Sequence, residues 1–463
     1  MSRDAELGAS LASATVVVVG LGRSGVAAAR LAATHGARVS ATDSAPFERL
    51  SAEARALSGA GVAIEAGGHA HVRFDEADII VMSPGVPGIP AVAAAEAAGA
   101  AVIGEIELAF RLAPPMPIVA IGGSNGKTTT TTLTGVMLEA LGAKPFVGGN
   151  IGTPPAEVLA DGSLGSHGVM VLELSSFQCE RMPHFRPDRA ALLNVSPNHL
   201  DRYAGFDDYV HAKGNMFKNQ TAADAAVVPA GDALCLAQAR RGGGTVLTFG
   251  PSTAGPADFV FDRDAITDTK RGIRYPRRAV RLVGEHNAAN ICAVLALIAD
   301  REPDPAVVLD VLGRFEGLPH RVSRVREHAG VTYYDDSKAT SVAAVVAAVT
   351  GLAEPRVVLI AGGRDKLGSY DPLVEALRAR GRAAVLIGEA ADRIASAIGD
   401  AVPVERAASM DEAVERAARL AESGDAVLLS PACSSFDMFR DYKHRGDAFV
   451  EAVMRLYGET CHV

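Results

Sequence analysis

A lysine-bearing glycine loop that follows an apolar run is the feature that most constrains the fold of this chain. Residues 118–121 read IVAI, and GGSNGKTTTTTL follows at residues 122–133. Strand, glycine loop and helix in this order are typical of a phosphate-binding loop, in which N–H groups near a helix N-terminus contact phosphate oxygens. The loop departs from the strict pattern at Ile121, where that pattern has glycine. It nevertheless predicts an α/β domain that binds a nucleotide.

The residue types of this loop suggest individual roles. The Lys127 ammonium would reach the β and γ phosphate oxygens, and the Thr128 hydroxyl would be a magnesium ligand. The loop alone leaves open whether ATP is hydrolysed, used as a kinase substrate or used for ligation. The predicted ATP-contacting residues of the loop are Gly123, Ser124, Asn125, Gly126, Lys127, Thr128 and Thr129.

Length, charge and cysteine spacing narrow the class of protein. A chain of 463 residues is too long for one core, and at ~150 residues per domain it predicts three domains. A net charge of −9 argues against a general nucleic-acid binder, which needs a dominant basic face. The five cysteines form no Cys-x-x-Cys pair, so no thiolate metal site is indicated. Apolar stretches stay below the ~18 residues of a membrane helix, and no signal-peptide pattern is recognisable. We therefore expect a cytoplasmic, monomeric enzyme.

Short β-branched runs alternate with alanine-rich helical stretches, as in parallel sheets covered by helices. Proline-containing breaks at 110–117 and 315–321 predict domains 1–112, 113–317 and 318–463. The predicted fold class is α/β, with a Rossmann-like N-terminal domain, a central P-loop ATPase domain and a Rossmann-like C-terminal domain. Strands are predicted at 15–19, 37–43, 118–121, 168–174, 189–195, 331–335, 356–361, 383–387 and 426–430, and helices from the turn at 20–25 to about residue 35 and at 285–301.

The first of these domains contains a second glycine loop. GLGRSG occupies residues 20–25, and Asp43 ends the next predicted strand. The G-x-G-x-x-G spacing permits a tight turn and a close approach of backbone amides to a phosphate. These residues alone are compatible with NAD, with a nucleotide sugar, or with a glycine turn that binds no ligand.

Two further stretches carry groups suited to catalysis. Glu173 ends the apolar strand in VLELSSFQ, where a buried carboxylate is costly unless it is paired or binds a cation. The alternative is a polar side chain satisfied at a strand end. His199 and Asp201 follow in NVSPNHLDRY, and Lys213 lies in YVHAKGNMF. Taken singly, a loop histidine is more often structural and a helix lysine is usually solvated.

In combination these motifs resemble the Mur ligases over nearly the whole chain. GLGRSG and SPACSSFDMFRDYKHRG are the more specific, and they are similar to the members that add D-glutamate. The Asp-Asn-Pro-Arg motif of the diaminopimelate- or lysine-adding members does not occur. The other stretches that carry the resemblance, in the family's order, are GSNGKTTTT, GGNIG, LELSSFQ, NVSPNHLDRY, GEHNAANICA, GLPHR, DDSKATS and IAGGRDK.

The resemblance implies an ATP-dependent ligase of cytoplasmic peptidoglycan precursor synthesis. Its substrates would be UDP-N-acetylmuramoyl-L-alanine and D-glutamate, joined through an acyl phosphate and a tetrahedral intermediate. It further implies two Mg²⁺ ions, one of them bound in part by a carbamylated Lys213. The implied catalytic residues are Lys127, Glu173, His199 and Lys213, and the implied metal ligands are Thr128, Glu173, His199 and Lys213.

The same resemblance implies binding residues for each substrate. The ATP set also includes Asn287, Arg321 and Asp336. The UDP-substrate set is Ser24, Asp43, Ser44, Ser83, Gly85, Asn150, Ser175 and Gln178. The D-glutamate set is Thr340, Lys366, Ser435 and Tyr442.

Three other interpretations compete with this one. A Rossmann dehydrogenase would account for GLGRSG and Asp43, but it would leave the second glycine loop, His199 and Lys213 unexplained. Another Mur ligase or a folylpolyglutamate synthase-like amide ligase would share the central motifs, although GLGRSG suits a UDP-binding domain that folate ligases lack. A non-catalytic nucleotide-binding regulator would bind ATP without substrate-dependent ADP release, and the intact set of catalytic residues argues against it.

Overall fold

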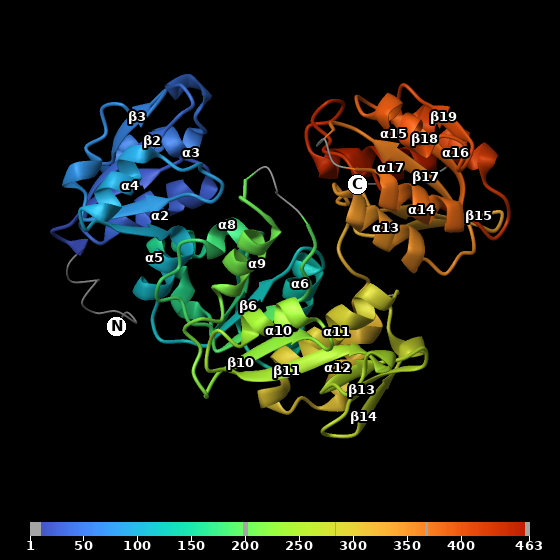
Figure 1. Cartoon of the computed structure of the whole chain (residues 1–463), viewed down its shortest axis with the longest axis horizontal. Coiled ribbons are helices and arrows are strands. Elements are labelled where there is room, and N and C mark those ends of the chain that lie inside the picture. Colours follow the sequence, from blue (N-terminus) through green and yellow to red (C-terminus); the bar gives the residue numbers. More distant parts are fainter. Residues whose placement is uncertain (1–10, 198–201, 283, 366–368, 459–463) are drawn as a thin grey trace. The chain divides into compact units, whose positions relative to one another are not determined.

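The computed structural model describes residues 11–197, 202–282, 284–365 and 369–458, which form three sheets with helices packed on them (Figure 1). The chain divides into two compact units. Unit 1 comprises the residues up to Ala279 together with Ala289–Val311, and unit 2 comprises Val280–Ala288 and the residues from Leu312 onward. Unit 1 holds the first two sheets and unit 2 holds the third. The predicted α/β class is confirmed.

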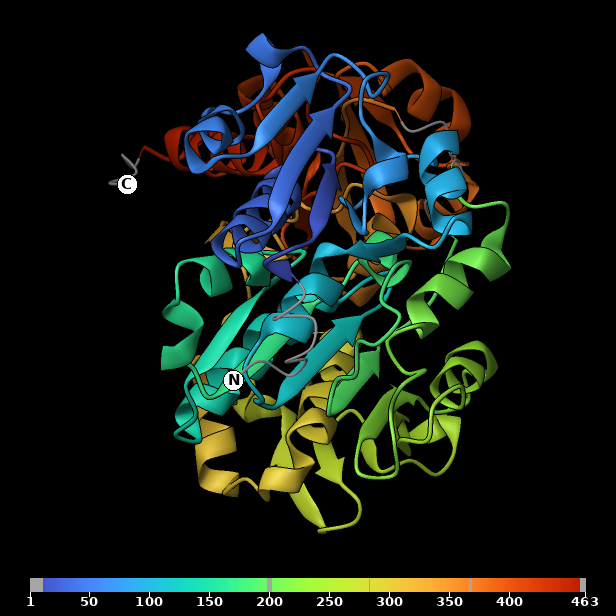
Figure 2. The ribbon, with the colours of Figure 1, turned by 90° about the vertical axis from the view of Figure 1, so that its left-hand side faces the viewer.

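The first sheet is parallel throughout, with the strand order β3-β2-β1-β4-β5, and Figure 2 shows several of its strands side by side in blue. The valines at 16–19 are at most 1% exposed, as expected for a central strand covered on both faces. Because β1 lies between β2 and β4, a crevice for ligands is expected at its carboxyl end. The predicted strands at 15–19 and 37–43 are confirmed. The elements are β1 (Thr15–Val19), α2 (Arg23–Thr34), β2 (Arg38–Asp43), β3 (Ala63–Ala66), β4 (Ile79–Met82) and β5 (Ala101–Gly104).

The second sheet has the order β14-β13-β12-β11-β10-β9-β6-β8-β7. Its strands are parallel from β7 to β12, and β13 and β14 add an antiparallel edge. The predicted strands at 118–121, 168–174 and 189–195 are confirmed, with somewhat shorter bounds for the last two. The strands are β6 (Ile118–Gly122), β7 (Pro145–Gly149), β8 (Val169–Glu173), β9 (Arg189–Leu192), β10 (Ala225–Pro229), β11 (Thr245–Pro251), β12 (Phe259–Phe261), β13 (Ala265–Asp268) and β14 (Ile273–Pro276).

Helix α5 (Glu105–Leu112) packs into the cores of both unit 1 sheets. Leu108 belongs to the apolar core of the first sheet, whereas Ile106 belongs to that of the second. Helix α7 (Pro155–Ala160) follows β7 of the second sheet, yet its Ala156 is buried in the core of the first. The two sheets of unit 1 therefore share apolar packing through these helices, and the predicted domain boundary near residue 112 falls at the end of α5.

Unit 2 contains the third sheet, with the order β15-β16-β20-β17-β18-β19. All its pairs are parallel except β15 with β16. The four predicted strands of this region and the helix near 285–301, which here ends at Leu297, are confirmed. Helix α11 (Glu285–Leu297) precedes this sheet in the chain, and its residues from Ala289 onward belong to unit 1. The later elements are β15 (Ser323–His328), β16 (Val331–Asp335), α13 (Val342–Gly351), β17 (Val357–Gly362), α14 (Asp371–Arg380), β18 (Gly381–Ile387), β19 (Val404–Arg406), α16 (Met410–Leu420), β20 (Ala426–Leu429) and α17 (Tyr442–Leu456).

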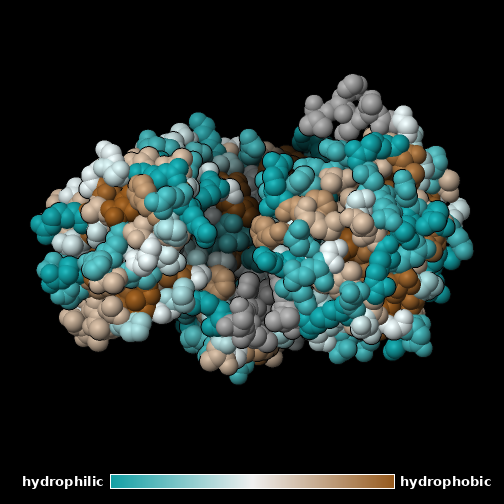
Figure 3. All heavy atoms as spheres, turned by 90° about the horizontal axis from the view of Figure 1, so that it is seen from above, coloured by the Kyte–Doolittle hydropathy of each residue, from teal (hydrophilic) through white to brown (hydrophobic). Residues whose placement is uncertain are grey.

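The face drawn in Figure 3 mixes hydrophilic residues with smaller hydrophobic areas. Among the helices of the described ranges, none combines the length and the apolar character that crossing a membrane requires.

Candidate active site

The glycine loop after β6 has the backbone geometry of a phosphate-binding turn. Gly123 and Gly126 have φ angles of +148° and +82°, which side chains rarely permit. A Cβ on Gly126 would also lie 2.4 Å from Oδ1 of Asn290. Helix α6 (Lys127–Ala140) begins directly after this glycine, which has no side chain to occupy the N–H groups of the first turn. Those N–H groups are therefore suited to bind phosphate oxygens.

Two backbone N–H groups of this loop donate hydrogen bonds to one neighbouring residue, Asn194, which is not among the predicted site residues. The N–H of Ser124 donates to the carbonyl of Asn194 at 2.9 Å, and the N–H of Asn125 donates to Oδ1 of the same residue at 2.8 Å. Asn194 lies just after β9, which pairs with β6. The loop is thus shaped by the segment that follows its neighbouring strand, and the first turn of α6 presents further N–H groups at the same end of the sheet.

The ammonium of Lys127 folds back onto the loop. Nζ donates to the carbonyl oxygens of Gly123 at 2.9 Å and Ser124 at 3.0 Å. Both acceptors are neutral, so anionic phosphate oxygens would bind this ammonium more strongly. Its position at the N-terminus of α6 places a positive charge beside the N–H groups described above.

Glu173 ends β8, at the edge where the carboxyl ends of β6, β8 and β9 meet. Its side chain is buried, and Oε1 accepts a hydrogen bond from Nδ2 of Asn150 at 2.7 Å. Within the described ranges, Oε2 is buried without a hydrogen-bond partner. An unpartnered buried carboxylate oxygen is costly, and a cation would relieve that cost. The carboxylate of Glu173 and the hydroxyl of Thr128, on the first turn of α6, are both oxygen donors of the type that Mg²⁺ prefers.

Lys213 is a buried lysine on α9 (Phe206–Gly214) that reaches the phosphate loop. Its Nζ donates to the carbonyl of Gly123 at 2.8 Å and lies 4.7 Å from the ring centre of Tyr209. Lys127 and Lys213 thus share one acceptor oxygen. Burial, and secondly the charge of Lys127, lowers the pKa of Lys213 to about 7. A large fraction of this amine is therefore neutral at physiological pH, which makes it a potential nucleophile.

Two of the predicted site residues, His199 and Lys366, lie outside the described residues, as does Asp201. Among the residues that the structure does describe, no three His, Cys, Asp or Glu side chains gather as a metal site. Magnesium at Glu173 and Thr128 would therefore depend on the oxygens of its bound nucleotide as well.

The crevice expected at the carboxyl end of β1 would be bounded by the loops that follow β1, β2 and β4. Asp43 accepts hydrogen bonds from the N–H of Leu21 at 2.6 Å and from that of Ala45 at 2.8 Å. Ser83 Oγ donates to the carbonyl of Gly20 at 2.7 Å. Both predicted UDP-site side chains therefore order the glycine loop. Ser24 lies on the first turn of α2, and Ser44 directly follows β2.

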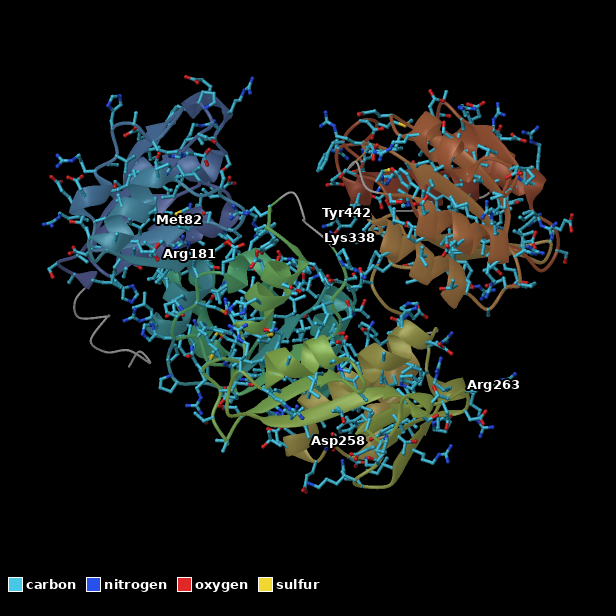
Figure 4. The ribbon with its side chains drawn as sticks, viewed as in Figure 1. Met82, Arg181, Asp258, Arg263, Lys338 and Tyr442 are labelled. Atoms are coloured by element: carbon cyan, nitrogen blue, oxygen red, sulfur yellow. The ribbon has the colours of Figure 1, made fainter. Side chains whose placement is uncertain are left out.

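A cavity of about 350 Å³ lies beside the loop that follows β4, within unit 1. Predicted UDP-site residues Ser83, Gly85 and Gln178 line it, together with Met82 and Arg181, which are labelled in Figure 4. Gln178 and Ser175 also form a capping box at α8 (Ser176–Cys179), in which Gln178 Oε1 accepts from the N–H of Ser175 at 2.9 Å. The cavity therefore lies between elements that follow β4 and elements that follow β8.

In unit 2, the predicted residue Tyr442 is the first residue of α17. The Lys338 ammonium sits 3.9 Å from the ring centre of Tyr442, and both are labelled in Figure 4. Lys338 was not singled out from the sequence, although its place in DDSKATS between predicted residues was a usable signal. Asp336 is buried, and its Oδ2 accepts from Ser430 Oγ at 2.7 Å. The other predicted residues of this unit are Asn287 on α11, Arg321 before β15, Thr340 after β16 and the buried Ser435.

Comparison with known protein families identifies the class. The Mur ligase middle domain matches residues 121–298, the Mur ligase glutamate ligase domain matches 320–433, and the Mur ligase MurD-like N-terminal domain matches 14–104. The chain therefore belongs to the Mur ligase family and is an ATP-dependent, amide-bond-forming ligase.

Individual relatives extend this finding over nearly the whole chain. The UDP-N-acetylmuramoylalanine--D-glutamate ligase of Geobacter metallireducens is 45% identical over 95% of this chain and 97% of its own length. The ligase of the same name from Pelobacter propionicus is 45% identical over 95% of this chain and 98% of its own. Among solved structures, the MurF ligase from Thermotoga maritima in complex with ADP covers 96% of this chain and 98% of its own, with 16% identity and a TM-score of 0.60. The similarity to the MurF ligase structure supports the fold alone.

Proposed function

We propose that this chain joins the amino group of D-glutamate to the carboxylate of UDP-N-acetylmuramoyl-L-alanine, driven by ATP, in peptidoglycan precursor synthesis. The observation that carries the proposal is the 45% identity of this chain, over 95% of its length, to proteins named UDP-N-acetylmuramoylalanine--D-glutamate ligase. The match of residues 14–104 to a MurD-like N-terminal domain supports a UDP substrate over a folate.

The proposed reaction activates a carboxylate, which otherwise resists attack by an amine. An oxygen of the alanyl carboxylate attacks the γ phosphorus of ATP, a new O–P bond forms, and the bond to ADP breaks. The amine nitrogen of D-glutamate then attacks the acyl carbon and forms the C–N bond. The tetrahedral intermediate loses a proton from nitrogen and expels phosphate as its C–O bond breaks. One amide, ADP and phosphate result.

The groups around the glycine loop fit these steps. Lys127 and the N–H groups at the start of α6 would hold the β and γ phosphates and offset the charge on the transferred oxygens. Glu173 and Thr128 would hold one Mg²⁺ ion, and His199 with carbamylated Lys213 would hold a second. When bound, the two ions would supply positive charge to the attacking and leaving oxygens.

The carbamate of Lys213 is supported by the environment of its amine. This amine is buried at the phosphate loop, where its lowered pKa of about 7 leaves much of it neutral. A neutral nitrogen can attack CO₂, so that a C–N bond forms and one proton leaves. A cationic side chain thereby becomes an anionic oxygen ligand of the type that Mg²⁺ prefers.

The remaining residues would bind substrates. Asn287, Arg321 and Asp336 would contact ATP, and Thr340, Lys366, Ser435 and Tyr442 would contact D-glutamate. Lysine and hydroxyl groups suit a dicarboxylate because each carboxylate needs charge-assisted donors. The UDP substrate would contact Ser24, Asp43, Ser44, Ser83, Gly85, Asn150, Ser175 and Gln178.

The direct test is ADP release from Mg-ATP in the presence of UDP-N-acetylmuramoyl-L-alanine, with D-glutamate, L-glutamate, L-lysine or meso-diaminopimelate added singly. We expect turnover with D-glutamate alone. Turnover with a different amino acid would assign another Mur ligase activity. Turnover only with a folate and L-glutamate would leave the central ATP chemistry in place and overturn the proposed UDP substrate.

Replacing Lys366 with alanine is expected to raise the KM for D-glutamate at least about tenfold while leaving the KM for ATP nearly unchanged, because one charge-assisted hydrogen bond to a carboxylate is lost. Steady-state kinetics with each substrate varied in turn would measure both constants. Lys270→Ala, which removes an exposed lysine before β14, is the matched control. Equal increases in both KM values would contradict the assignment of Lys366 to D-glutamate.

A further inference from the structure

Arg23 is a charged residue beside the predicted UDP site, and the proposed chemistry leaves it without a role. It lies in GLGRSG at residues 20–25, where it begins α2 and directly precedes Ser24 of the predicted UDP-substrate set. Its side chain is exposed, and Nη1 donates a hydrogen bond to the carbonyl of Gly152 at 2.9 Å. The guanidinium therefore reaches from the glycine loop of the first sheet to the GGNIG stretch, 148–152, at the end of β7.

The GGNIG stretch is also bound to the predicted magnesium ligand Glu173. The backbone N–H of Asn150 donates to the carbonyl of Glu173 at 2.9 Å, and its Nδ2 donates to Oε1 of the same residue at 2.7 Å. Gly152 follows Asn150 closely in the chain. Arg23 thus joins two loops to which the proposed function assigns the same substrate, through Ser24 on one loop and Asn150 on the other.

The guanidinium of Arg23 uses few of its hydrogen-bond donors within the described part of the chain. A guanidinium carries several N–H groups in a planar fork, and the carbonyl of Gly152 accepts from one of them. Among the residues that the structure describes, the side chain makes no further hydrogen bond and no ion pair. Because the side chain is also exposed, a ligand that lies between the two loops can reach it.

The loops at the carboxyl ends of β1, β2 and β4 contain no lysine or arginine of their own. They run over 20–22, 44–46 and 83–89 and read GLG, SAP and SPGVPGI. A diphosphate is strongly anionic, and charged donors bind it more strongly than neutral ones. Arg23 directly follows the first of these segments, so it places a permanent positive charge at this edge of the sheet.

We propose that Arg23 is a further substrate-binding residue, whose guanidinium donates to oxygens of the substrate's diphosphate while Nη1 keeps the carbonyl of Gly152. This inference rests on the proposed function, because it takes the ligand of the first sheet to be a UDP compound. Arginine suits this position because its planar fork can donate to more than one acceptor at once. The bound diphosphate and the loop that holds Glu173 would then share one side chain.

Arg30 provides a matched control on the same helix. It lies about two turns after Arg23, which is about 10 Å along α2. Replacing it with alanine removes the same charge from α2 at a distance where salt largely screens its effect on the diphosphate. Arg30→Ala therefore tests whether a change of net charge alone accounts for the effect of Arg23→Ala.

The test is equilibrium binding of UDP-N-acetylmuramoyl-L-alanine and of UDP to the full chain by calorimetry, without ATP. For Arg23→Ala we expect the Kd of both compounds to rise about tenfold or more, because charge-assisted hydrogen bonds to the diphosphate are lost. Uridine lacks the phosphates, so its Kd, measured by competition with UDP, should be the same for Arg23→Ala and the wild type. Arg30→Ala is expected to bind UDP within about twofold of the wild type.

Arg23→Lys keeps the positive charge but not the planar fork, so its Kd for UDP is expected to lie between those of the wild type and Arg23→Ala. An equal loss of affinity for UDP and uridine in Arg23→Ala, or wild-type affinity for UDP in that variant, would overturn the inference. D-glutamate-dependent ADP release by the wild type separates the two levels. If the wild type turns over and Arg23→Ala binds UDP like it, only the role of Arg23 fails, whereas absent wild-type turnover contradicts the proposed function.

Discussion

Replacing Lys213 with alanine is expected to lower kcat about 1,000-fold, because it would remove the proposed magnesium ligand beside the transferred phosphoryl group. If the ligand is a carbamate, a small carboxylate can take its place in the space that the side chain leaves. Acetate or formate should therefore restore activity to Lys213→Ala but not to the wild type. ADP release at increasing acetate concentration measures the rescue.

Two further variants test this prediction. Lys213→Arg keeps a positive charge but cannot become neutral, so it should be as inactive as the alanine variant and should resist rescue because the space stays filled. Lys218→Ala removes a lysine one turn beyond α9 and should keep wild-type kcat. Failure of every small carboxylate to restore Lys213→Ala, together with no carbamate density at Lys213 in a crystal structure, would exclude the carbamate.

Replacing Lys127 with alanine is expected to lower kcat about 1,000-fold as well, because the γ phosphate oxygens would lose the cation that we propose offsets the charge developing on them. The dissociation constant of ATP should change much less, since the N–H groups of α6 remain. Single-turnover ADP formation and nucleotide binding would measure the two effects separately. Lys144→Ala, an exposed lysine soon after the same helix, is the control.

The double variant of Lys127 and Lys213 should be less impaired than the product of the two single effects. Both ammonium groups share the carbonyl of Gly123, and the charge of Lys127 contributes to the lowered pKa of Lys213. Residues coupled in this way act as a unit in kinetic measurements. Independent, multiplicative losses would show that the two side chains act separately.

The parts of the fold that sequence reasoning predicted well are those with strong local signals. Residues 16–19 and 118–121 are uninterrupted apolar runs because they form central strands that are covered on both faces. The turn glycines Gly20 and Gly126 stand out because their positive φ angles exclude most side chains. Each such signal lies within a few residues of the chain, so one sequence is enough to read it.

Other features depend on contacts between distant residues and could not be read in this way. The short strands β12, β13 and β14 extend the second sheet, but three or four residues carry little periodicity. Asn194 accepts hydrogen bonds from two backbone N–H groups that lie 69 and 70 residues earlier in the chain, and no local sequence pattern indicates these contacts. Glu105 and Glu107 look like ordinary acids at the start of a helix, and their burial results from packing against segments about 50 to 80 residues further on.

The sharing of α5 between two cores bears on how chimaeras of this enzyme have to be constructed. Leu108 packs in the core of the first sheet, and Ile106 packs in the core of the second. Ala156 of α7 also packs in the core of the first sheet. A hybrid joined at residue 112 would set a foreign α5 against the native α7 and leave mismatched side chains in both cores. A transferable module is therefore expected to include α7 as well as the first 112 residues.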